Sequence, residues 1–203
     1  MPETKQQAVV KSLVPSPKSL ADLHLFTMPE GGTDRLNFIT WDTIAVQGFD
    51  EETIEFHGYY AIERATPTSA DWQEASVDIR MRELSVDGVS QQFGKLHVSV
   101  NEVIGLPSGG QVRPGTTYAD VADSPKMCQM YGYMQFDLTD LGMTLFNKEA
   151  ILLEHTITHI PPIGQGGGTR PDTALALYRL DDPDGQPVAV LKRVKTHIGA
   201  WQE

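Results

Sequence analysis

Two histidines four residues apart, His155 and His159, have the spacing that most directly suggests chemistry. Apolar residues stand at 151, 153 and 157, so a strand over 150–160 would place both imidazoles on one apolar face. A strand would also hold them about 13 Å apart. That span is too long for both rings to bind one zinc ion at about 2.0–2.1 Å. We therefore expect each ring either to hydrogen-bond within the core or to face a bound small molecule.

A metal site is the second hypothesis, because imidazole binds transition metals and several strands could each contribute one. His57 and His97 fall on the polar faces of two further predicted strands. The candidate metal ligands are His57, His97, His155 and His159. A helix would bring the last two together, but Thr156 occupies the position at which a zincin helix carries its catalytic glutamate.

Two loops are predicted to close a pocket near these histidines, at 105–126 and 161–171. The second contains the run Gly164 to Arg170, which lacks the Gly-Lys-Ser/Thr ending of a phosphate-binding loop and is predicted to be a flexible hairpin loop or lid. Arg170 is a candidate for holding an anionic group of a ligand. Tyr118, in the first loop, is a candidate pocket residue because long loops are often functional.

The elements that must position these residues are strands, because apolar and polar residues alternate along most of the chain after residue 33. The pattern is interrupted after Arg82, which predicts a bulge or a strand end, and Asp87-Gly88 and 182–185 are predicted turns. We expect an all-β domain, an antiparallel β-sandwich of about eight strands or alternatively a closed β-barrel. The predicted strands cover 35–46, 53–63, 76–82, 92–100, 127–138, 150–160, 174–180 and 188–198.

The 203 residues are sufficient for one domain, predicted over 33–203, preceded by an extended arm over 1–32. Pro15 and Pro17 would interrupt any regular element in that arm, and Gly31-Gly32 ends it. The arm is predicted to be a mobile tail or a strap on a neighbouring subunit, which allows a homo-oligomer.

Charge and composition restrict the partners. Lys and Arg number 16 against 27 Asp and Glu, a net charge of −11, which argues against nucleic acid. Cys128 is the one cysteine, so no intramolecular disulfide can form. The sequence has no apolar run of the roughly 20 residues that a membrane helix needs and no secretory signal at its start, so a cytoplasmic location with no membrane partner is expected.

Three functions follow from these patterns. The first is a small-molecule-binding β protein, whether or not it is an enzyme, with a pocket at His155, His159, Arg170 and Tyr118. The second is a metal-dependent enzyme with histidine ligands from several strands. The third is an assembly module that uses the N-terminal arm.

Overall fold

The computed structural model describes residues 28–200 except 73, 102, 104 and 115–125. Twelve strands and one 3-10 turn, η1 (Thr139–Leu141), form in these residues. The strands are β1 (Gly32–Val46), β2 (Glu52–Arg64), β3 (Val77–Ser90), β4 (Gly94–Val100), β5 (Gly109–Pro114), β6 (Lys126–Gly132), β7 (Met134–Leu138), β8 (Met143–Asn147), β9 (Ile151–Ile157), β10 (Gly166–Gly168), β11 (Leu175–Arg179) and β12 (Ala189–Gly199). Among the described residues, no helix combines the length and the apolar character needed to span a bilayer.

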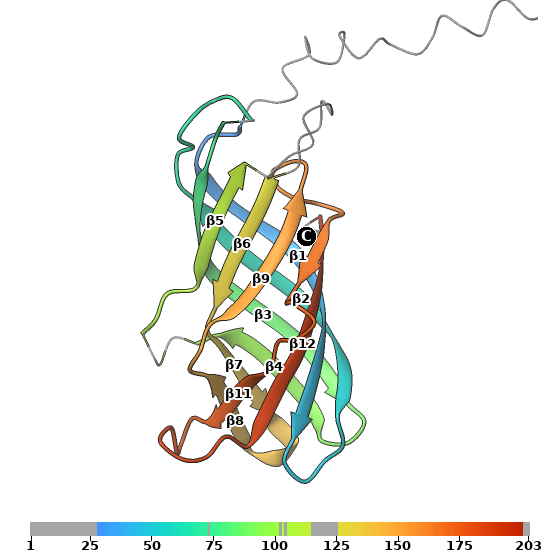
Figure 1. The fold of residues 1–203 in the computed structure, drawn as a ribbon. Coiled ribbons are helices and arrows are strands. Elements are labelled where there is room, and N and C mark those ends of the chain that lie inside the picture. Colours follow the sequence, from blue (N-terminus) through green and yellow to red (C-terminus); the bar gives the residue numbers. More distant parts are fainter. Residues whose placement is uncertain (1–27, 73, 102, 104, 115–125, 201–203) are drawn as a thin grey trace, which may run out of the picture.

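All strand pairings are antiparallel, and the sheet closes on itself through β1 and β12. Four long strands, β1, β2, β3 and β12, form one side of the ring along its whole length (Figure 1). The other side consists of two sets of short strands. The upper set in Figure 1 is β5, β6, β9 and β10, and the lower set is β4, β7, β8 and β11. The prediction of an antiparallel all-β domain is confirmed.

The long strands change partners halfway along, which is how both sets attach to them. β3 pairs with β5 through residues 77–80 and with β4 through residues 85–90. β12 pairs with β11 through residues 189–191 and with β10 through residues 195–197. Each set thereby completes a ring of eight strands with the same four long ones.

Buried polar side chains bridge the seam between the two sets. Asn147 accepts a hydrogen bond from the backbone N–H of Met134 at 2.7 Å and donates to the carbonyl of Gly132 at 2.9 Å. The Ser108 hydroxyl accepts from the N–H of Tyr133 at 2.8 Å. Backbone groups that lose their strand partners at the β6–β7 break are thus satisfied by side chains rather than left unpaired in a dry interior.

Alternation places the core inside the ring, with Phe56, Phe136 and Leu145 among its most deeply buried side chains. The interrupted pattern after Arg82 is a bulge, since Ala61 pairs with Glu83 while Ile62 pairs with Met81. The predicted turn at Asp87-Gly88 is wrong. Both residues lie within β3 and pair with β2 and β4, so the polar and glycine residues that mark many turns here occupy the middle of a strand.

All eight predicted strands are present, and the stretch 127–138 is divided into β6 and β7. The further strands are β5, β8 and β10. β5 and β10 are rich in glycine, and β8 reads Met-Thr-Leu-Phe-Asn, so none of the three alternates clearly enough to be recognised. Of the predicted arm, residues 1–27 lie outside the described residues, and β1 already begins at Gly32.

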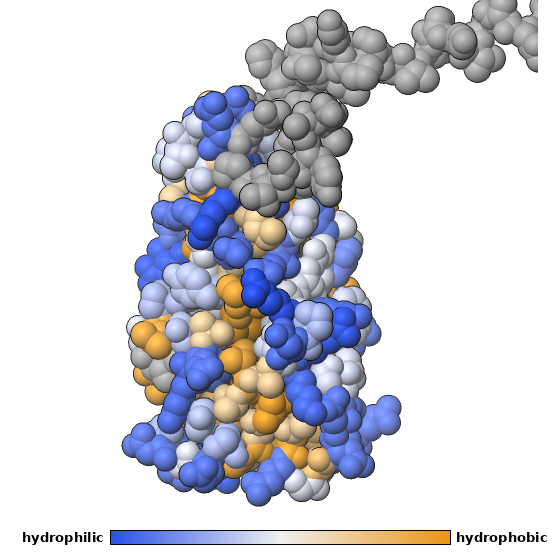
Figure 2. Space-filling view, in the orientation of Figure 1, coloured by the Kyte–Doolittle hydropathy of each residue, from blue (hydrophilic) through white to orange (hydrophobic). Residues whose placement is uncertain are grey.

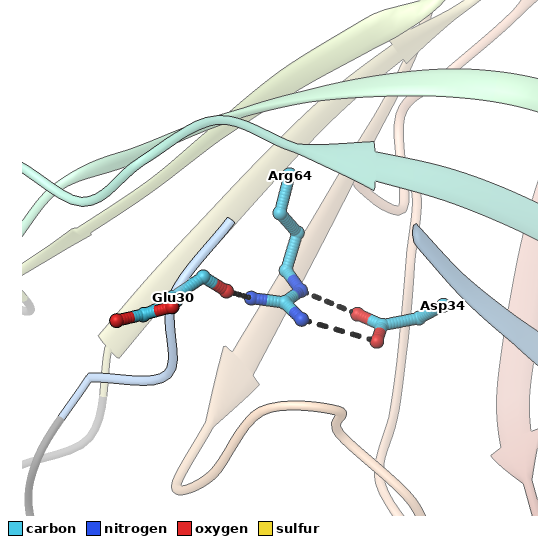
Figure 3. Close-up of polar contacts among 3 residues, drawn as sticks. All are labelled: Glu30, Asp34 and Arg64. Carbon is cyan, nitrogen blue, oxygen red and sulfur yellow. Dashed lines mark hydrogen bonds and ion pairs between the residues drawn. The ribbon is translucent and has the colours of Figure 1, made fainter. Parts of the chain in front are cut away.

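An ion pair joins the start of β1 to the end of β2 (Figure 3). The Arg64 guanidinium donates to both carboxylate oxygens of Asp34, at 2.6 and 3.3 Å, and to the carbonyl of Glu30 at 2.5 Å. The two charged side chains are only 9% and 12% exposed, and the fork geometry of arginine satisfies both oxygens at once. This contact fixes the chain segment that enters the ring.

Candidate functional site

His155 faces the interior from the middle of β9, with 3% of the residue exposed. Its ring has one hydrogen-bond partner among the described residues, the hydroxyl of Thr196 on β12, at a long Nε2 to Oγ1 distance of 3.4 Å. Burial lowers the pKa of His155 to about 4, because a charged imidazolium would be poorly solvated here. The ring is therefore neutral at physiological pH, and the contact with Thr196 uses only one of its two nitrogens.

A second buried ionisable group, Asp42, belongs to the same face. Thr196 lies directly opposite Thr40 on β1, and the Thr40 hydroxyl donates to Asp42 Oδ1 at 2.5 Å. Asp42 is 4% exposed. Burial raises the pKa of its carboxyl to about 7, although the hydrogen bond from Thr40 acts in the other direction. We refer to Asp42, Thr40, Thr196 and His155 as the inner polar row.

A glycine makes room for this row. Gly167 on β10 pairs with Thr196 on one side and His155 on the other. A Cβ atom at this position would lie 2.6 Å from the His155 ring and 2.4 Å from the carbonyl oxygen of Glu154. Without a side chain at 167, the imidazole can occupy the inner surface of β10.

Among the residues that the structure describes, the surroundings of the row supply no counter-ion. Ile54 and Val194 pair with Asp42, and Phe56 pairs with Thr40. Cys128 pairs with His155, and burial raises the pKa of its thiol to about 12, so it stays protonated. Among the described residues, the Asp42 carboxyl has the single hydrogen-bond partner Thr40. The row consequently presents unused hydrogen-bonding capacity within an apolar interior.

His159 does not share the face of His155, so this part of the prediction is wrong. β9 ends at Ile157, and the alternation does not continue through the bend that follows. His159 is exposed, with Nδ1 accepting from the Gln165 amide at 2.9 Å and Nε2 donating to the Ile163 carbonyl at 3.0 Å. Both ring nitrogens therefore form hydrogen bonds within the turn between β9 and β10.

The two predicted loops are partly strand. Gly109–Pro114 is β5, and Gly166–Gly168 is β10, which pairs with strands on both sides and is therefore not a lid. Arg170 lies on the outer surface and forms an ion pair with Glu154 at 3.1 Å, which holds the pKa of that carboxyl below its usual range. Tyr118 lies outside the described residues.

The predicted metal ligands do not come together. His57 and His97 lie on the outer face, where they pair with Glu55 at 2.6 Å and with Asp87 at 2.8 Å, whereas His155 faces inward. Within the part of the chain that the structure describes, no three histidine, cysteine or acidic side chains are grouped closely enough to hold a metal ion. A three-histidine site built from these residues is therefore wrong.

Three members of the inner polar row were absent from the sequence-based candidates: Asp42, Thr40 and Thr196. The alternation that predicted β1 and β12 contained the relevant pattern. Thr40 and Asp42 interrupt an apolar face that otherwise reads Leu36, Phe38, Ile44 and Val46. A polar pair on the buried face of a predicted strand was the feature that could have identified them.

Comparisons with known proteins give one family and one solved structure. The model of a family of unknown function, DUF6073, matches residues 14–203. The structure of DynF from the dynemicin biosynthesis pathway of Micromonospora chersina is 34% identical in sequence, with a TM-score of 0.81. The match covers 88% of this chain and 84% of DynF. No curated protein matches.

Proposed function

We propose that this chain, which belongs to the DUF6073 family of unknown function, binds a small, largely apolar molecule inside the strand ring, beside Asp42 and His155. The observation that carries the proposal is the inner polar row. Two ionisable side chains are buried without a counter-ion among the described residues, and those residues leave part of their hydrogen-bonding capacity unused. Burying such groups costs free energy, and a ligand that bonds to them would offset that cost.

The ring geometry supports the same proposal. Rings of about eight strands enclose a space that is either filled by side chains or accommodates one small ligand. Small-molecule sites are mostly apolar, with a few convergent polar groups that orient the ligand. The apolar wall around Asp42 and His155 has this composition.

The protonation states define the type of contact. Neutral His155 offers one donor and one acceptor, and Asp42 near neutral pH is divided between carboxylic acid and carboxylate. A hydroxyl or carbonyl group on an otherwise apolar ligand would match both. DynF belongs to a biosynthetic pathway, and a role in handling a pathway intermediate is consistent with such a site.

A neutral, environment-sensitive dye such as Nile red tests this proposal. We expect saturable binding with a blue-shifted emission, and we expect His155→Trp, which puts a larger side chain at the buried position, to abolish it. The matched control is His57→Trp, which adds the same bulk on the outer surface and should leave binding unchanged. The pair is needed because an apolar strip is exposed on the outer surface and could also adsorb the dye (Figure 2).

Thr196→Val and Asp42→Asn, which preserve shape, cover the case in which His155→Trp does not fold. We expect either to weaken dye binding several-fold, or to change the emission maximum, because the polarity beside the dye changes. Equal dye binding by wild type, Thr196→Val and Asp42→Asn would refute the assignment to the inner polar row. Absence of saturable binding by the wild type would refute the interior site.

A further inference from the structure

The outer surface of β10 is hollowed because Gly166 and Gly168 have no side chains there. Gly166 pairs with His197 and Gly168 with Lys195 on β12, while Gly168 pairs with Glu154 on β9. The missing side chains leave a hollow of about 590 Å³ between these neighbours. Cβ atoms at Gly166 and Gly168 would lie 2.5 and 2.3 Å from backbone oxygens of β12, so the hollow depends on glycine.

The lining of this hollow is cationic, although the protein as a whole has a net charge of −11. Arg170, Arg193 and Lys195 line it, together with His197. The one carboxylate in the lining is Glu154, which is already paired with Arg170. Within the described part of the chain, Arg193 and Lys195 form no ion pair, so two positive charges remain uncompensated.

An aromatic side chain forms the adjoining wall. Trp41 pairs with Lys195 across β1 and β12, and it lines both this hollow and a neighbouring one of about 440 Å³ that also contacts Arg193 and Lys195. The indole Nε1 donates to Glu55 at 2.9 Å, which fixes the ring. That bond and the contact with His57 hold the pKa of Glu55 below its usual range, so the acceptor stays ionised.

We propose that this outer hollow binds a small aromatic anion, with its acidic group between Arg193 and Lys195 and its ring against Trp41. Guanidinium and ammonium groups recognise sulfonate, phosphate or carboxylate oxygens by charge-assisted hydrogen bonds. A flat ring packs well on indole. This site is on the opposite face of the sheet from the inner polar row and does not depend on it.

Pyrene-1,3,6,8-tetrasulfonate is a suitable probe, because four sulfonates keep it out of an apolar interior. Fluorescence anisotropy at low salt should show saturable binding to the wild type. The double variant R193Q/K195Q should weaken it about tenfold or more. R82Q/R179Q changes the net charge equally, and both residues lie in exposed ion pairs away from the hollow, so binding should stay within about twofold of the wild type.

Trp41→Leu separates the aromatic contact from the charges. We expect it to weaken binding of the tetrasulfonate several-fold and to leave the weaker binding of inorganic phosphate, followed by NMR shifts, unchanged. Equal losses in the two double variants would mean general attraction to charge and would overturn the site. No saturable binding by the wild type would overturn it as well, and either result leaves the Nile red experiment on the interior unaffected.

Discussion

The ionisable groups on the inner face of β1, β12, β10 and β9 favour their neutral forms, whereas those on the outer face are charged. Inside, Asp42 and His155 have no counter-ion in the described part of the chain, and burial favours the neutral form of each. Outside, Glu154 and Arg170 are paired in solvent and burial plays little part, so both remain charged. The same strands therefore offer neutral hydrogen-bonding groups to the interior and fixed charges to the solution. Solvent access decides which chemistry each face can do.

Glycine contributes to both faces of β10, but in different ways. On the inner face, the missing side chain of Gly167 is replaced by the His155 ring. On the outer face, the missing side chains of Gly166 and Gly168 are not replaced, and a hollow remains. One run of three glycines thus accommodates a buried imidazole and opens a cationic surface site.

The largest expected effect that tests this contrast is the pH dependence of Asp42→Asn. The folded-state pKa of Asp42, about 7, lies above its ordinary value of 3.8, so the folded protein holds this proton more tightly. Asp42 therefore costs stability as pH rises from about 4 to 7, by about 4 kcal/mol in total. Relative to wild type, Asp42→Asn should gain that amount between pH 4 and 7 and then stay level, measured by urea unfolding.

Asp184→Asn is the control for that experiment, because Asp184 is exposed in the turn after β11. Its difference from wild type should change little with pH. If the Asp42→Asn difference were equally flat, Asp42 would not be the poorly solvated carboxyl described above.

His155→Gln should give the opposite slope. The folded-state pKa, about 4, lies below the ordinary 6.5, so wild-type stability is lost as pH falls from 6.5 towards 4, by about 3 kcal/mol. Relative to wild type, the variant should gain this amount over the same range in urea unfolding. In wild type the contributions of Asp42 and His155 cancel between pH 4 and 6.5.

His197→Gln, an exposed histidine on the outer face of β12, is the matched control. Its unfolding should follow that of wild type across the same pH range. A slope for His155→Gln no steeper than that of this control would contradict a buried, neutral imidazole.

The sequence allowed the long strands to be predicted because period-two alternation is strong wherever one face is buried. It did not allow β5 or β10 to be predicted, since glycine carries no hydropathy pattern. Asp87-Gly88 was misassigned because the sequence alone does not distinguish a glycine in a turn from a glycine in a strand that allows a neighbouring side chain to lie close to its backbone. In β3, a Cβ atom at Gly88 would lie 2.7 Å from the Phe56 ring.

The candidate site was only half predictable for a related reason. His155 was identified from its alternation with apolar neighbours, and its burial confirms that orientation. Its partners Thr196 and Asp42 lie on β12 and β1, and their proximity depends on the closure of the ring, which needs the strand order. His159 was misplaced because nothing local indicated that β9 ends at Ile157 rather than three residues later.

The smallest expected effect concerns the outer face and completes the contrast. R193Q/K195Q removes two solvated charges that have no ion-pair partner among the described residues, so each substitution should change the free energy of unfolding by less than about 0.5 kcal/mol. The difference from wild type should not vary with pH between 4 and 8, since neither side chain is paired with a titrating group among the described residues. Urea unfolding at pH 4, 6 and 8 measures this directly. A pH-dependent loss of stability would show that these cations interact with titrating groups of the protein, and the outer hollow would then not be available to an external anion.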